Sequence, residues 1–255
     1  MTILRGLFIL EVAHESHINS KGARVAAHKT IIQPQTVREF QEMNAYIYGK
    51  VNERYDDPDL ILRLLEEIAK IMEIARKDEL EKLPSQLART YSWWNAVGNR
   101  FGIDLQEALW VKYPGVCPYC LRGENCACAI EHPVISDREK TLRRLRMERD
   151  KDPKTLAGYQ ALHKRLYFLQ NRRILVLHTA AHLGEEAGEI SKEARHHNKK
   201  GLEDEMADVA SWMFALANRC RIELAEEVWR QYPYECEKCH LAVCTCECSD
   251  SPQAS

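Results

Sequence analysis

Hydrophobic and polar residues follow a helical period over most of this 255-residue chain. Two neighbouring segments show it most clearly, with apolar residues three or four positions apart: Leu183, Ala187, Ile190 and Ala194 in one, and Leu202, Met206, Val209, Met213 and Leu216 in the other. That spacing places the apolar side chains on one face of a helix. The same pattern predicts helices over 36–51, 59–76, 84–101 and 104–112, and a similar set from 155 to 230. The sequence therefore predicts an all-α protein.

The two sets of predicted helices are similar in sequence. Between residues 92 and 120, 13 of 29 positions are identical to those 119 residues later, without a gap. A chance register would not hold over such a span, so the pattern indicates a tandem duplication. We name residues 36–128 repeat one and residues 155–248 repeat two; each consists of a helical part followed by a short cysteine-rich segment.

Three further segments lie outside the repeats. Residues 1–35 form an N-terminal extension, in which residues 3–13 are predicted as an extra strand or an extra helix. Residues 129–154 carry many arginines among acids and are predicted as a charged, solvated linker helix. The serine-containing tail, residues 249–255, is predicted to be disordered.

Composition excludes several classes of function. The chain has 36 basic and 38 acidic residues, so no broad positive field favours nucleic acid as a partner. No apolar run is long enough to span a membrane. The apolar block at residues 7–10 is too short for the core of a signal peptide. We therefore expect a cytoplasmic protein that binds neither a membrane nor nucleic acid.

The cysteines form two clusters of metal-ligand spacing. The first is Cys117, Cys120, Cys126 and Cys128; the second is Cys236, Cys239, Cys244 and Cys246. A Cys-x-x-Cys pair followed by a Cys-x-Cys pair supplies four thiolates for a tetrahedral Zn²⁺ site. In a reducing compartment such clustering favours metal over disulfides, and we expect structural zinc. An iron–sulfur cluster and ligands shared between the clusters are the alternatives. Cys220 lies on a helix stripe and is expected in the core.

Four acidic residues border the apolar stripes of repeat two: Glu186, Glu189, Glu205 and Asp208. Residues three apart share a helix face, so a helical hairpin would direct all four carboxylates towards one point. Partly desolvated carboxylates repel one another unless a cation lies among them, and oxygen ligands suit Mg²⁺ or Mn²⁺. The alternative is a solvated acidic face. Gly184 and Gly188 would leave a bare strip where a helix or ligand can approach closely.

This acidic pattern resembles a known family. Glu185-Glu186-x-x-Glu189, then Glu205-x-x-Asp208, then Asn218-Arg219 is similar to the MazG-type all-α nucleoside triphosphate pyrophosphohydrolases, over roughly residues 155 to 235. The resemblance implies helical bundles, a homo-oligomer in many members, and Mg²⁺-dependent conversion of a nucleoside triphosphate to a monophosphate and pyrophosphate in a nucleotide-pool or house-cleaning role. The four acids would then be catalytic metal ligands.

Several residues near the acids are candidates for substrate binding: His182, Glu185, Lys192, Lys199 and Asn218. Each has a structural alternative. The lysines lie in or near a basic turn that is often only solvated, and His182 could serve in the core or as a cap. Trp212 either stacks on a base or packs in the core.

Repeat one departs from the acidic pattern. Glu66 and Glu67 are kept, but Lys70, Gln86 and Arg89 stand where repeat two has Glu189, Glu205 and Asp208. We therefore predict one divalent-metal site per chain, in repeat two, with repeat one as a packing partner or a decayed copy. A catalytically silent nucleotide sensor or assembly module is the alternative function.

Overall fold

The computed structural model describes residues 31–131, 133–148 and 153–246. Every helix described below lies in one compact unit, residues 33–255. The predictions for residues 3–13 and for the tail 249–255 lie outside the described residues. The described residues are helical and contain no strand, which confirms the all-α prediction. Their one β-type contact is an isolated antiparallel bridge between Thr36 and Thr155.

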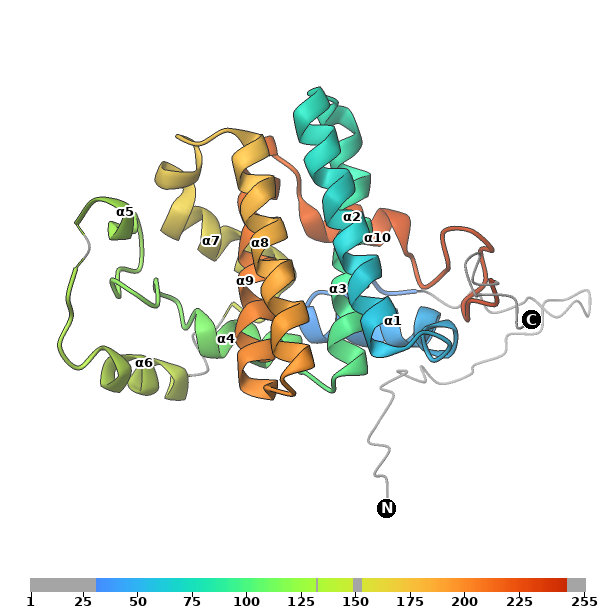
Figure 1. Ribbon diagram of the computed structural model, residues 1–255, viewed down its shortest axis with the longest axis horizontal. Helices are drawn as coiled ribbons and strands as arrows, with labels where there is room; N and C mark the ends of the chain where they lie inside the picture. The colour runs from blue at the N-terminus through green and yellow to red at the C-terminus, as the bar shows by residue number, and fades with distance from the viewer. Residues whose placement is uncertain (1–30, 132, 149–152, 247–255) are drawn as a thin grey trace, which may run out of the picture. The chain divides into compact units, whose positions relative to one another are not determined.

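Repeat one and repeat two each contribute four main helices (Figure 1). Those of repeat one are α1 (Val37–Asn52), α2 (Asp57–Lys77), α3 (Leu83–Arg100) and α4 (Leu105–Lys112), with a short 3-10 turn at Leu80–Lys82. Those of repeat two are α7 (Leu156–Asn171), α8 (Val176–Arg195), α9 (Lys199–Cys220) and α10 (Leu224–Gln231). Between them lie α5 (Cys128–Glu131) and α6 (Arg138–Met147).

Side-chain caps explain where several helices begin. The Thr36 hydroxyl accepts a hydrogen bond from the backbone of Glu39, whose carboxylate accepts one from the backbone of Thr36, a capping box. Asp56 and Asp104 cap α2 and α4 by accepting from backbone N–H groups three residues on. These local hydrogen bonds favour helix starts at the residues that follow each cap.

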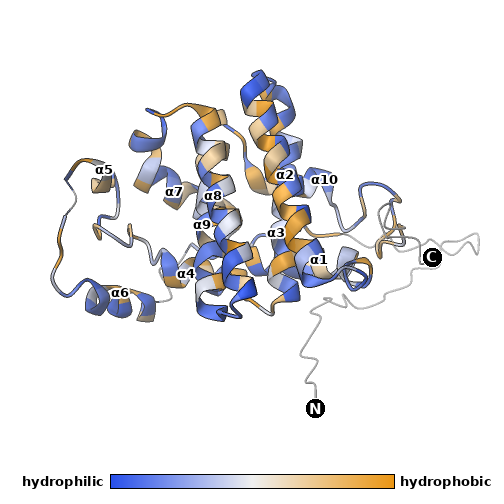
Figure 2. Ribbon diagram, in the orientation of Figure 1, coloured by the Kyte–Doolittle hydropathy of each residue, from blue (hydrophilic) through white to orange (hydrophobic). Residues whose placement is uncertain are grey.

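Helices α2, α3, α8 and α9 pack against one another and form the centre of the core. The hydrophobic stripes that they bury are visible in Figure 2. The Trp94 indole, fully buried on α3, donates to the carbonyl of Met206 on α9 at 2.8 Å. A Cβ at Gly184 would lie 2.1 Å from Met72 Cε, so this glycine permits the close approach of α2 to α8. Gly188 has no such neighbour within 4 Å.

The C-terminal part of each repeat packs on the other repeat. Helix α4 contacts α9, and helix α10 contacts α3. The cysteine-rich segments continue this exchange: the backbone N–H of Cys126 donates to the Leu166 carbonyl at 2.7 Å, and that of Cys244 donates to the Ile47 carbonyl at 2.8 Å. Ile47 and Leu166 stand 119 residues apart, so equivalent positions receive equivalent bonds.

The linker differs from its prediction as a solvated helix. Most residues of α6 are hydrophilic (Figure 2), and most of them are exposed, but Leu142 is buried. The Trp110 indole donates to the Arg146 carbonyl at 3.1 Å, and the Arg146 guanidinium donates to the Val111 carbonyl at 2.9 Å. The linker helix is therefore docked beside α4. None of the described helices is long and apolar enough to cross a membrane.

Candidate metal centres

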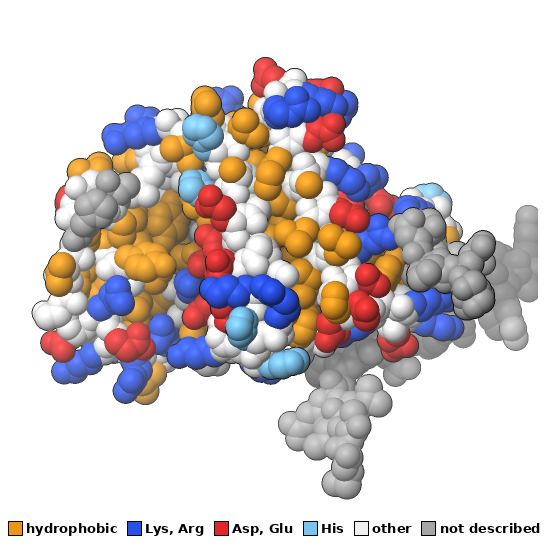
Figure 3. Space-filling model, viewed as in Figure 1, with side chains coloured by type: hydrophobic (Ala, Val, Ile, Leu, Met, Phe, Trp, Pro, Cys, Tyr) orange, Lys and Arg blue, Asp and Glu red, His pale blue; other side chains and the backbone are white. Residues whose placement is uncertain are grey.

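Three of the four predicted acids converge. Glu186 lies on α8 and Glu205 and Asp208 lie on α9, and carboxylate oxygens of the three fall within 4.8 Å of one another. The tight turn between the helices makes this possible, because the Asn198 side chain caps α9 by accepting from the Gly201 backbone. Figure 3 shows acidic side chains gathered in a strip over α8 and α9, open to solvent at one side. We name Glu186, Glu205 and Asp208 the acidic cluster.

Glu189 does not join the acidic cluster. Its carboxylate accepts from Lys192 Nζ at 2.5 Å, and its side chain is 45% exposed. Glu189 and Lys192 stand three apart on the same helix, where opposite charges pair readily. The predicted convergence of four carboxylates is therefore replaced by a group of three, with Glu189 at its solvent side.

Two residues of repeat one complete the acidic cluster, and no local sequence pattern indicates either of them. At the end of α4, Lys112 Nζ lies 3.0 Å from Asp208, and the Tyr113 hydroxyl donates to the other oxygen of Asp208 at 2.6 Å. Lys112 and Asp208 have side chains only 16% and 17% exposed. The recurrence of Tyr113-Pro114 at Tyr232-Pro233 marks Tyr113 as a repeated position. No short-range sequence pattern, however, connects Tyr113 with Asp208.

The electrostatics of the acidic cluster reflect crowding of like charges. Burial and the nearby charge of Asp208 raise the pKa of Glu205 from 4.5 to about 7. Burial and Asp208 also raise the pKa of Glu186. Burial opposes the charged form of Lys112, but Asp208 outweighs it and raises the pKa of that ammonium. The Lys112 ammonium offsets part of the repulsion among the three carboxylates, and a bound divalent cation would offset more of it.

We expect Mg²⁺ affinity to rise as pH rises through about 7, because protonated Glu205 competes with the metal. The sign for folding is opposite. The folded pKa of Glu205 lies above its unfolded value of 4.5, so its contribution to the stability of the metal-free protein is present below that value and lost as pH rises through about 7. Calorimetric Mg²⁺ titrations on both sides of neutrality check the first statement. Equal Mg²⁺ affinities below and above pH 7 would contradict the expected rise.

Lys112→Gln is expected to destabilise the metal-free protein by on the order of 2 kcal/mol, because Asp208 loses its partner among other carboxylates. Saturating Mg²⁺ should remove most of this loss, since the cation replaces the ammonium charge. Thermal melts with and without Mg²⁺ test this. Lys82→Gln, which breaks an exposed pair with Glu79, is the control. A loss that persists unchanged in Mg²⁺ would contradict the expectation.

Aromatic groups border the acidic cluster. The Trp212 indole donates to Glu186 at 3.2 Å and stacks on the His182 ring, with ring centroids 4.6 Å apart and planes at 17°. His182 in turn bonds Glu185 at 2.7 Å, and the Glu185 side chain is 69% exposed. His182 and Trp212 thus form a half-exposed stack beside the carboxylates, while Glu185 faces solvent.

The remaining candidates for substrate binding make other contacts. Lys199 donates to the Gly102 carbonyl at 3.2 Å. Lys192 pairs with Glu189, as described above. Asn218 donates to the Gln160 carbonyl at 3.0 Å, and its own side-chain oxygen accepts from the Gln160 amide at 3.3 Å. Asn218 therefore joins α9 to α7 in this structure.

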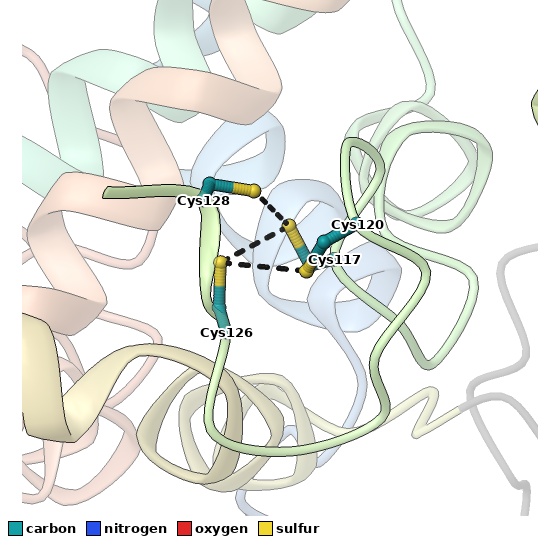
Figure 4. A group of neighbouring side chains, drawn as sticks. All are labelled: Cys117, Cys120, Cys126 and Cys128. Atoms are coloured by element: carbon teal, nitrogen blue, oxygen red, sulfur yellow. Dashed lines mark hydrogen bonds between the residues drawn. The ribbon is translucent and has the colours of Figure 1, made fainter. Parts of the chain in front are cut away.

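The first cysteine cluster has the dimensions of a zinc site. Cys117 Sγ lies 3.6 Å from Cys128 Sγ and 3.4 Å from Cys126 Sγ, and Cys120 Sγ lies 3.7 Å from Cys126 Sγ (Figure 4). Zinc–sulfur bonds of about 2.3 Å in a tetrahedron require sulfur–sulfur edges of about 3.8 Å. All four thiols are free, so the spacing does not come from disulfides. The donor set and spacing fit zinc.

The second cluster repeats this arrangement. Ligand atoms of Cys236, Cys239, Cys244 and Cys246 lie within 4.8 Å of one another. Backbone N–H groups of Thr245 and Leu241 lower the pKa of Cys239 to about 6. In the first cluster, burial raises the pKa of Cys120, but backbone bonds at Arg122 and Ala127 outweigh it and lower the value to about 7. One thiol of each cluster therefore favours the thiolate, the form that binds metal, whereas burial raises the pKa of Cys126 to about 11 and also raises the pKa values of Cys128, Cys244 and Cys246. A bound metal would stabilise all four thiolates of a cluster.

Comparisons with protein-family models, with curated proteins and with solved structures found no match to this chain.

Proposed function

We propose that the chain is a Mg²⁺-dependent nucleoside triphosphate pyrophosphohydrolase related to the MazG-type enzymes, with its single active site at the acidic cluster. The observation that carries this proposal is the convergence of Glu186, Glu205 and Asp208 from two antiparallel helices. The motif resemblance described above places the same residues in the family's acidic signature. The hard oxygen donors and the raised pKa values of Glu186 and Glu205 fit a divalent cation.

The residues of the acidic cluster suit hydrolysis of a phosphoric anhydride. A bound Mg²⁺ would neutralise part of the phosphate charge and would lower the pKa of a water molecule bound to it. Lys112 and Tyr113 hold Asp208 in a fixed orientation. A carboxylate of the acidic cluster that is not bound to the metal would accept a proton from the attacking water. The His182–Trp212 stack is positioned to contact the base or ribose. Attack at the α-phosphorus is the reaction that the family resemblance implies.

We also propose that the two repeats arose by tandem duplication of a MazG-like bundle. Matching hydrogen bonds support this. In repeat one, Gln41 donates to the Asn99 side chain and to the Ile103 carbonyl. In repeat two, Gln160 donates to the Asn218 side chain and to the Ile222 carbonyl. Each of the three residues in repeat two stands 119 positions after its counterpart in repeat one. In family members that form homodimers, two chains supply such halves; here one chain would supply both.

Release of pyrophosphate from each common nucleoside triphosphate, with and without Mg²⁺, tests the proposed function. We expect Mg²⁺-dependent release of pyrophosphate and a nucleoside monophosphate in equal amounts. Orthophosphate in place of pyrophosphate would place the attack at the γ-phosphorus and contradict the proposed reaction. The assay also reads base and sugar preference directly.

A nucleotide-binding sensor without turnover is the second candidate. The cationic and amide residues Lys70, Gln86 and Arg89 at the ligand positions of repeat one favour it, because a chain that has lost one site could have lost its activity altogether. Binding of a nucleoside triphosphate without any pyrophosphate release would support this candidate over the enzyme.

A further inference from the structure

Repeat one contains a cavity of about 350 Å³ at the position that matches the acidic cluster. Helices α1, α2 and α3 form three of its walls, and the segment after α10 closes it. Glu67 and Arg89 line it, and these residues stand 119 positions before Glu186 and Asp208. The volume lies at the lower end of the range, about 300–1,000 Å³, that small-molecule sites occupy.

The charges in this cavity oppose binding of a divalent cation. Glu67 is the one acid retained at a ligand position, and its carboxylate already accepts from Gln86 at 2.6 Å and from Lys70 at 2.7 Å. Arg89 occupies the position of Asp208. A cation entering here would meet the positive charges of Lys70 and Arg89 with one saturated carboxylate between them. The cavity therefore selects against the metal that the acidic cluster attracts.

Two exposed cations in the same cavity can bind an anion. The lining holds four cations, Arg63, Lys70, Arg89 and Lys238, together with two acids, Glu67 and Glu237, and three thiols of the second cysteine cluster, Cys236, Cys244 and Cys246, whose negative charge a bound zinc ion would partly offset. Arg89 contacts Glu237 through Nε at 3.2 Å, and its side chain is 45% exposed. The Lys70 side chain is 50% exposed and carries three donors. Guanidinium and ammonium groups converging in one cavity match a phosphate.

Aromatic rings supply the second half of a nucleotide site. Trp93, Tyr55 and Tyr48 line the cavity beside the cations. Trp93 and Tyr55 pack edge to face with ring centroids 5.9 Å apart, so both rings are held in position. Trp93 is half-buried and stands 119 residues before Trp212. Aromatic side chains of this kind stack on bases irrespective of sequence.

We propose that this cavity, the cationic pocket, binds a nucleoside monophosphate without a divalent cation. The phosphate contacts Arg89 and Lys70, and the base packs against Trp93. A single phosphate suits the two exposed cations, and the Glu67 carboxylate, already bonded to Gln86 and Lys70, is not available to Mg²⁺. This binding does not depend on turnover at the acidic cluster, so the two proposals can fail separately.

Calorimetric titration with AMP in magnesium-free buffer, without chelator so that zinc is retained, tests the cationic pocket. We expect one AMP per chain. Arg89→Gln and Lys70→Gln should each weaken binding at least about tenfold, since each removes a charged bond to phosphate. Lys77→Gln is the matched control, because Lys77 lies on the same helix as Lys70 and pairs with Glu73. Trp93→Leu should weaken AMP binding and leave binding of inorganic phosphate unchanged.

Other outcomes would overturn the proposal. No AMP binding by the native chain, or equal binding by Arg89→Gln, would do so. Inorganic phosphate binding as tightly as AMP would refute the role of the aromatic wall. Loss of AMP binding in Glu205→Gln would place the ligand in the acidic cluster instead. Binding that survives Glu205→Gln and is lost in Arg89→Gln is the result that the cationic pocket requires.

Discussion

Glu205→Gln is expected to reduce Mg²⁺-dependent pyrophosphate release at least about hundredfold, equivalent to about 2.7 kcal/mol of transition-state stabilisation. The substitution removes one of three converging carboxylates and the group with the pKa of about 7. It should also stabilise the metal-free protein above neutral pH, because it relieves repulsion among the acids. A variant that is more stable and inactive is hard to explain by misfolding. Turnover at saturating Mg²⁺, together with a thermal melt, measures both effects.

Glu203→Gln is the matched control for this prediction. Glu203 lies on the same helix, two residues away, and does not belong to the acidic cluster. Its substitution should change turnover less than about twofold. Asp208→Asn should also abolish activity, but it leaves Lys112 without its partner and is expected to lower stability. Full turnover in Glu205→Gln would remove the acidic cluster from the proposed function.

Replacing Cys236 and Cys239 together with serine is expected to lower the zinc content from about two ions per chain to about one and to lower the melting temperature by about 10 °C or more. Zinc contributes on the order of 10 kcal/mol to small thiolate sites. The segment buries few large apolar side chains of its own, so hydrophobic burial cannot replace the metal. Turnover per folded molecule should not change, because this segment packs on repeat one at Ile47 rather than beside the acids. Elemental analysis and calorimetry measure these quantities.

Cys220→Ser separates zinc loss from a general effect of removing thiols. Cys220 lies at the end of α9, apart from both clusters, and packs against the core. This variant should keep two zinc ions and lose little stability. Native protein that contains neither zinc nor iron when purified under reducing conditions would contradict the assignment of the cysteine clusters.

The helices could be predicted from sequence because their causes are local. Apolar spacing placed α2 and α3 to within two residues of their observed bounds, and Asp104 marked the start of α4. The fit of the cysteines to a metal site was also local, since Cys-x-x-Cys and Cys-x-Cys fix most of the geometry. Glu186, Glu205 and Asp208 converge as the periodicity predicted. These features need only the pitch of a helix or the reach of a short loop.

Other features of the acidic cluster could not be predicted in this way. Tyr113 and Asp208 are 95 residues apart in sequence, and their bond depends on the packing of α4 against α9. Helical pitch also placed Glu189 with the other acids, but a competing partner, Lys192, stands on the same face. Helix α6 is docked through hydrogen bonds of the Arg146 backbone and side chain. A segment so rich in arginine is predicted from its charge to be exposed to solvent, so these bonds could not be predicted.

The exchange of C-terminal segments has a consequence for the order in which the chain folds. When synthesis has passed α4, its partner α9 is not yet made, so the face of α4 that will contact α9 remains open to solvent. The first cysteine cluster likewise cannot form its hydrogen bond to the Leu166 carbonyl until α7 has been synthesised. Loop closure over such separations is costly in entropy, so both contacts should form late, after α8 and α9 have paired. The nascent chain therefore passes through a stage in which its first half is helical, incompletely buried and dependent on residues still to emerge from the ribosome.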